Sequence, residues 1–170
     1  MSQPSPPPPP SAGSPPDCAA SLRVGAPTAD GVSVTVTLHN ASAAPLQLLQ
    51  STRMPYVIVE APDQIVLAWS IQPIPPDLDL GGVEPLATVE IAAGSDLQRD
   101  ATLRMPLQVS THLSSAHPHP SPLPRTVKVV AEFGLVPEPL DPSQRHRQNY
   151  TALVDSQRTC RSAAVTVTLP

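Results

Sequence analysis

Three histidines fall within one short stretch in the second half of the chain, a grouping that could hold a metal ion. They are His112, His117 and His119, and three imidazoles are a common ligand set for zinc. The surrounding sequence is rich in Ser and Pro, and a His-Pro-His backbone is stiff and extended, so alternate side chains are expected to point apart. We therefore expect a solvated loop here and no metal site.

The sequence carries none of the compact motifs that mark common enzyme classes. Gly-x-Ser-x-Gly, His-Glu-x-x-His, the P-loop and the dinucleotide fingerprint are all absent. Asp77 and Asp79 are paired carboxylates, but they lie in a Pro- and Gly-rich loop with no His or Lys beside them. We therefore expect a non-enzymatic protein that has no catalytic residues and uses no cofactor.

A Pro-rich loop over residues 114–125 is the most unusual stretch of the expected domain. Each residue before a Pro is pushed towards extended conformations, which predicts a stiff polyproline arm between two strands. A stiff, exposed arm loses little entropy on docking, which suits the recognition of another protein. The alternative is a spacer that contacts nothing. The candidate contact residues are Pro118, His119, Pro120, Pro122, Leu123, Pro124 and Arg125.

Composition excludes several classes of function. Of 170 residues 25 are Pro, which excludes an all-helical protein or a coiled coil. A formal net charge of −4 with scattered Arg residues provides no basic stripe for nucleic acid, and few aromatic residues provide no stacking platform. No apolar run approaches the roughly 20 residues that a membrane helix needs. We expect neither a nucleic-acid nor a membrane partner.

Residues 1–19 are expected to form a disordered Pro-rich tail, and residues 20–170 a single folded domain. Such a tail populates polyproline II and has nothing apolar to bury. An alternative is a ligand for an aromatic-lined groove, but no Arg occurs before Arg23 to orient it. Residues 1–16 also lack the basic and apolar regions of a secretory signal, so the cytoplasm is the expected location.

From residue 20 on, apolar and polar side chains alternate with a period of two, which is typical of half-buried strands. The clearest run is residues 32–39, in which Val and Leu alternate with Ser, Thr and His. Trp69 lies near the end of another run and is expected to be a core aromatic. Further strands are predicted over residues 21–25, 46–50, 56–60, 65–70, 87–91, 103–109, 127–133 and 165–169.

Short strands joined by turns and not by helices predict an all-β protein. Seven to nine such strands within residues 20–170 are typical of an antiparallel immunoglobulin-like β-sandwich. One short helix is expected after Asp141, which would cap it, with Pro142 at its first position. Tyr150, Leu153 and Val154 would form the apolar side of this helix.

Two cysteines, Cys18 and Cys160, precede the first and the last expected strand. In immunoglobulin-like sandwiches these two strands run parallel to each other in part, so the sulfurs could meet and form a disulfide. A bond that closes so long a loop would add about 4–5 kcal/mol of stability. The alternative is a pair of free thiols in a reducing cytoplasm. Without a signal peptide, we favour the free thiols.

Residues 34–40 (VTVTLHN), 54–59 (MPYVIV) and 66–70 (VLAWS) form a strand ending in Asn, a Tyr-containing strand and a return strand ending in Trp-Ser. This pattern resembles the core of the bacterial intracellular proteinase inhibitor family, and residues 91–94 (IAAG) resemble its apolar-x-x-Gly turn. The resemblance implies a cytoplasmic, non-catalytic sandwich. It also makes proteinase inhibition an alternative function, with Arg125 facing a trypsin-like specificity pocket.

The leading hypothesis is a non-enzymatic module that binds a protein partner of unknown identity through the Pro-rich segments. The first alternative is the cytoplasmic proteinase inhibitor. The second is a structural subunit or an exported surface domain, which the Cys pair suggests. Two glycosylation sequons, at Asn40 and Asn149, point the same way.

Overall fold

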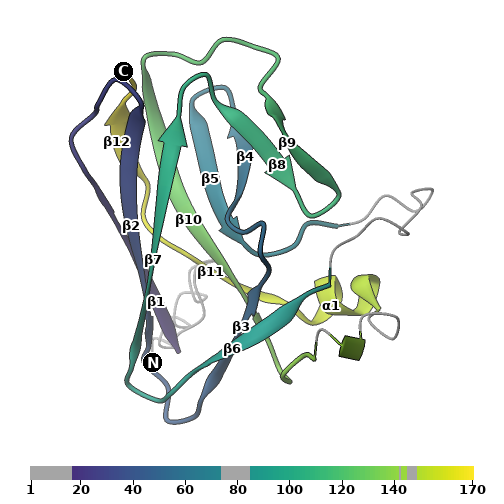
Figure 1. Cartoon of the computed structure of the whole chain (residues 1–170). Coiled ribbons are helices and arrows are strands. Elements are labelled where there is room, and N and C mark those ends of the chain that lie inside the picture. The colour runs from purple at the N-terminus through teal and green to yellow at the C-terminus, as the bar shows by residue number, and fades with distance from the viewer. Residues whose placement is uncertain (1–16, 74–84, 142, 145–148) are drawn as a thin grey trace, which may run out of the picture.

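The computed structural model describes residues 17–73, 85–141, 143–144 and 149–170 (Figure 1). Most of the predicted tail, residues 1–16, and the paired carboxylates Asp77 and Asp79 lie outside the described residues. Over these residues the protein is all-β, as expected, with one short helix. The elements are β1 (Cys18–Val24), β2 (Gly31–Asn40), β3 (Leu46–Gln50), β4 (Tyr56–Ala61), β5 (Gln64–Trp69), β6 (Ala87–Ile91), β7 (Asp96–Arg104), β8 (Gln108–Thr111), β9 (Ser114–Pro118), β10 (Thr126–Val136), α1 (Tyr150–Ser156), β11 (Arg158–Arg161) and β12 (Val165–Thr168).

Two sheets share the core. The smaller sheet has the order β1-β2-β7 and is antiparallel throughout. The larger has the order β4-β5-β10-β3-β6, and β11 and β12 also pair with β10. A separate hairpin of β8 and β9 lies beside β4 in Figure 1.

One pair of strands contradicts the antiparallel prediction. β5 and β10 run parallel, from the pair Gln64 and Lys128 to the pair Trp69 and Phe133, so the larger sheet is mixed. A parallel pair needs a long crossover, which is usually a helix. Here the crossover includes strands β6 to β9, and for this reason the sequence lacks the helical signal that would have revealed it.

The alternation in β2 builds one wall of the core. Val32, Val34, Val36 and Leu38 are at most 1% exposed and belong to one cluster with inward-facing residues of β5 and β10. Trp69 belongs to this cluster and stacks on Phe133 with ring centroids 5.1 Å apart. The prediction that Trp69 is a core aromatic is confirmed.

The strand predicted over residues 103–109 is divided in two. β7 ends at Arg104 and β8 begins at Gln108, because Pro106 between them has no N–H to donate to a ladder. β7 begins at Asp96, well before the predicted start, in a stretch of mostly polar residues. Its outer side chains are exposed. The first part of β7 therefore shows little alternation of apolar and polar residues, and the sequence does not predict it as a strand.

The predicted loop over residues 114–125 begins with a strand. β9 pairs with β8, with Val109 opposite His117 and Gln108 opposite Pro118. Pro118 is tolerated because β9 is an outer strand of the hairpin, where a missing N–H breaks no ladder. The arm is therefore shorter than predicted and spans residues 119–125, and the described residues contain twelve strands instead of seven to nine.

α1 confirms the predicted apolar side but has a different cap. Tyr150, Leu153 and Val154 pack in a second cluster against strands of the larger sheet. The cap is Asn149, whose side chain accepts a hydrogen bond from the Ala152 amide at 3.0 Å, and not Asp141. Within the described residues, no helix is long and apolar enough to cross a membrane.

The sequon residue Asn40 is a structural side chain. It is fully buried, and its amide donates hydrogen bonds to the carbonyls of Ala44 and Ile91, each at 2.9 Å. These contacts tie the end of β2 to the following turn and to β6. A glycan on this amide would disrupt its hydrogen bonds and would not fit in the folded protein, so this sequon gives no support to the exported alternative.

Candidate partner-binding site

The arm, residues 119–125, crosses one end of the two facing sheets, at the top of Figure 1. Its first residue, His119, donates its backbone N–H to the Leu107 carbonyl at 2.9 Å. Its last residue, Arg125, accepts a hydrogen bond from the Leu169 amide at 2.8 Å. The arm is thus held at both ends by backbone hydrogen bonds.

The predicted contact residues divide into anchors and exposed positions. Leu123 is half-buried and packs against the main core, and His119 is also half-buried. The exposed residues are Pro118, Pro120, Pro122, Pro124 and Arg125. Leu123 therefore holds the arm to its own domain, while the proline rings remain available to a partner. We call Pro120, Pro122 and Pro124 the Pro ridge.

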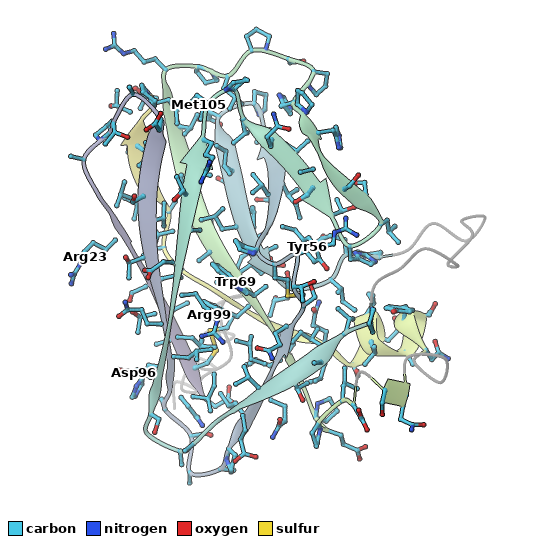
Figure 2. All side chains as sticks on the ribbon, viewed as in Figure 1. Arg23, Tyr56, Trp69, Asp96, Arg99 and Met105 are labelled. Atoms are coloured by element: carbon cyan, nitrogen blue, oxygen red, sulfur yellow. A yellow bond between two sulfur atoms is a disulfide. The ribbon has the colours of Figure 1, made fainter. Side chains whose placement is uncertain are left out.

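Two hollows flank the Pro ridge. The larger, of about 560 Å³, lies between the arm and a wall that includes Met105, Leu107 and Leu169; Figure 2 shows Met105 at this end of the molecule. The smaller, of about 370 Å³, lies between the arm and the turn from β4 to β5, including Val59. The two hollows beside the Pro ridge are therefore places where protruding side chains of a partner could fit.

Arg125 does not have the geometry of an inhibitory residue. A proteinase inhibitor must offer the carbonyl of its specificity residue to the enzyme's oxyanion hole. The Arg125 carbonyl already accepts from Leu169, and the next residue, Thr126, is paired with Thr168 in the ladder of β10 and β12. This arrangement argues against the inhibitor hypothesis based on Arg125.

We expect Leu123→Ala to loosen the arm locally. Removing a half-buried leucine side chain costs about 1–2 kcal/mol of packing, so the open population of the arm should rise about tenfold. Because proteolysis of a rapidly opening segment tracks that population, trypsin should cut after Arg125 about tenfold faster, as followed by mass spectrometry. Leu97→Ala, a half-buried leucine of β7 on the same core, is the control. Equal acceleration in both variants would contradict a local role for Leu123.

The three histidines do not gather around one point. His112 is buried at 1% exposure and lies against Tyr56, with ring centroids 6.3 Å apart. His117 is exposed and His119 half-buried, on the outer strand of the hairpin and just beyond it. Among the residues that the structure describes, no group of three or more His, Cys, Asp or Glu side chains could hold a metal ion.

A charged cluster on the larger sheet was not predicted. Arg161 donates hydrogen bonds of 2.6 Å to both Glu132 and Glu60, and Ser70 donates to Glu132 at 2.5 Å. The hydrogen bond from Arg161 holds the pKa of Glu60 below its ordinary value, and the contact with Glu60 raises the pKa of Arg161. The cluster ties β4, β10 and β11 together. The residues of the cluster are far apart in sequence, so no local sequence pattern predicts the cluster.

The structure joins Cys18 and Cys160 in a disulfide, with Cα atoms 6.5 Å apart. The cysteines lie within β1 and β11 and not, as predicted, before the first and the last strand. The parallel contact of β1 is a bridge between Ala20 and Ser162, which lies between β11 and β12. Both cysteines are buried. The favoured expectation of free thiols is therefore wrong for this structure.

Comparisons with known proteins do not assign the chain to a family. No family model matches the sequence, and no match was found among curated proteins or solved structures. The resemblance to the intracellular proteinase inhibitors stays a prediction. Function is therefore inferred from the geometry of the site, because a β-rich fold hosts many functions.

Proposed function

We propose that this chain is a non-enzymatic, immunoglobulin-like β-sandwich module that binds another protein through the Pro ridge. The observation that carries the proposal is an arm fixed at both ends, with exposed proline rings between two hollows. Proline fixes its own φ angle, and the contacts with Leu107 and Leu169 hold the two ends of the arm. Little entropy is then lost on docking.

The surface fits a partner with aromatic side chains. Exposed proline rings dock on aromatic rings in many peptide-binding proteins, and the hollows beside the Pro ridge offer space for neighbouring side chains. The partner would straddle the arm, with contacts to the Met105 side and to the Val59 side.

We further propose that the module works in an oxidising compartment. Disulfides persist in such compartments and are rare in the cytosol, and the bond between Cys18 and Cys160 is buried. This supports the exported alternative over the cytoplasmic location expected from the sequence. The parallel contact of β1 with the segment after β11 supports the immunoglobulin-like assignment.

Site-directed photo-crosslinking of the full chain tests the binding proposal. A photoreactive side chain at Pro122 should capture a partner in extracts of the source cells, whereas the same group at Ser33, exposed on β2, should not. With the captured partner purified, Pro120→Asp combined with Pro122→Asp should weaken binding at least about tenfold.

The matched control is Ser21→Asp combined with Ser33→Asp, two exposed positions on β1 and β2. It adds the same charge away from the arm and should leave the affinity unchanged. Equal losses in both double variants, or none in the arm variant, would rule out the Pro ridge as the contact surface.

A further inference from the structure

His117 and His119 lie on one side of the hairpin, contrary to the expectation that they point apart. His117 pairs with Val109 in the ladder of β8 and β9, and the backbone contact of His119 with Leu107 continues that ladder. In a β-strand, side chains two residues apart share a face, whereas in polyproline II, with three residues per turn, they diverge. The strand geometry thus brings the two imidazoles to the same side.

His117 and His119 both line one hollow of about 230 Å³ between the hairpin and β4. The lining also includes the aliphatic side chains of Val57, Val59 and Val109. Since His117 is exposed and His119 half-buried, solvent reaches the mouth of the hollow. Two nitrogen ligands with water at the remaining positions are a workable set for a transition-metal ion.

One nitrogen of each imidazole ring, Nδ1, already contacts a backbone carbonyl oxygen. His117 Nδ1 lies 3.0 Å from the Ser115 carbonyl, and His119 Nδ1 lies 2.7 Å from the Ser121 carbonyl. A carbonyl oxygen only accepts, so in the neutral form of each ring Nδ1 carries the proton and Nε2 has the lone pair. The Ser121 amide is 3.4 Å from His119 Nδ1, which is long for a hydrogen bond, so the carbonyl contact decides the tautomer.

We propose that His117 and His119 bind one divalent transition-metal ion through their Nε2 atoms. A hydrogen bond from the other ring nitrogen to a carbonyl is the usual support of a metal-binding histidine, because it fixes the tautomer and the ring orientation. Imidazole ligands suit Zn²⁺, Ni²⁺ and Cu²⁺, and Cu²⁺ has the highest affinity in that series. His119 is also the first residue of the arm and lines both hollows beside the Pro ridge, so the metal site adjoins the proposed protein-binding surface. Metal binding can be measured without the protein partner.

Titration of the full chain with Cu²⁺ tests this site. We expect one bound Cu²⁺ per chain, with two imidazole nitrogens seen by pulsed electron paramagnetic resonance. His117→Asn and His119→Asn should each weaken binding at least about tenfold, and the double variant should abolish it. Because both side chains lie at the surface, the circular dichroism of the variants should match that of the wild type.

His39→Asn is the matched control. His39 is a half-buried histidine whose side chain is 45% exposed, paired with Asp96 at 2.5 Å on the outer face of the smaller sheet, and its loss should not change Cu²⁺ affinity. Unchanged binding in the double variant would overturn the proposal, and so would a wild-type spectrum with a single imidazole nitrogen. The number of imidazole nitrogens in the wild-type spectrum tests the proposal even if a variant fails to fold.

Discussion

Replacing Cys18 and Cys160 by alanine is expected to lower the free energy of unfolding by about 4–5 kcal/mol. The bond links residues 142 positions apart and therefore restricts nearly the whole unfolded chain. In the folded state it connects the start of β1 to β11, beside the ion pair of Asp17 with Arg158. Guanidinium unfolding of the wild type and the double variant measures the difference.

Reduced wild-type protein provides the control for this substitution. It should unfold at the same denaturant concentration as the double variant, and adding reductant to the double variant should change nothing. If the oxidised and reduced wild-type proteins unfold together, the disulfide does not stabilise the fold, and the argument for an oxidising compartment loses its basis.

Gly31→Ala is expected to cost about 3 kcal/mol or more. Gly31 begins β2 with φ at +143°, in the region that favours glycine, and such a conformation costs other residues about 1–3 kcal/mol. A Cβ atom here would also approach the Leu103 carbonyl oxygen of β7 to 2.1 Å. The backbone of β2 or β7 would have to move, which disturbs the core around Val32.

Gly94→Ala separates the cost of the positive φ angle from the cost of the steric contact. Gly94 also has a positive φ, +73°, but a Cβ atom there meets nothing within 4 Å. This substitution should therefore cost only the conformational penalty, about 1–2 kcal/mol. Thermal and denaturant unfolding of both variants would check the difference, and equal losses would show that the contact with Leu103 is relieved without cost.

Local patterns predict the strands that alternate cleanly between two turns. β3 has the predicted bounds, and β2 is one residue longer than predicted at each end, because a period of two and a turn signal are both local properties. The pairing of β5 with β10 is not predictable in this way. It joins residues more than 60 positions apart, and the direction of a strand pair depends on the path of the chain between them.

The candidate site is likewise predictable from local sequence only in part. The prolines of the arm identify an extended surface segment directly from sequence. The anchoring of Leu123 in the core and the contact of Arg125 with Leu169 depend on where the C-terminal strand lies. The shared face of His117 and His119 depends on β9 pairing with β8, which the Pro content of that segment conceals.

The central position of β10 has a consequence for biosynthesis. β10 pairs with β5, β3, β11 and β12, yet its residues leave the ribosome late. At about 5–20 residues per second, β5 waits several seconds as an open edge before its neighbour is made. The nascent chain must be protected from pairing with other chains during that interval. A truncation anywhere before residue 126 also removes the strand around which the larger sheet assembles.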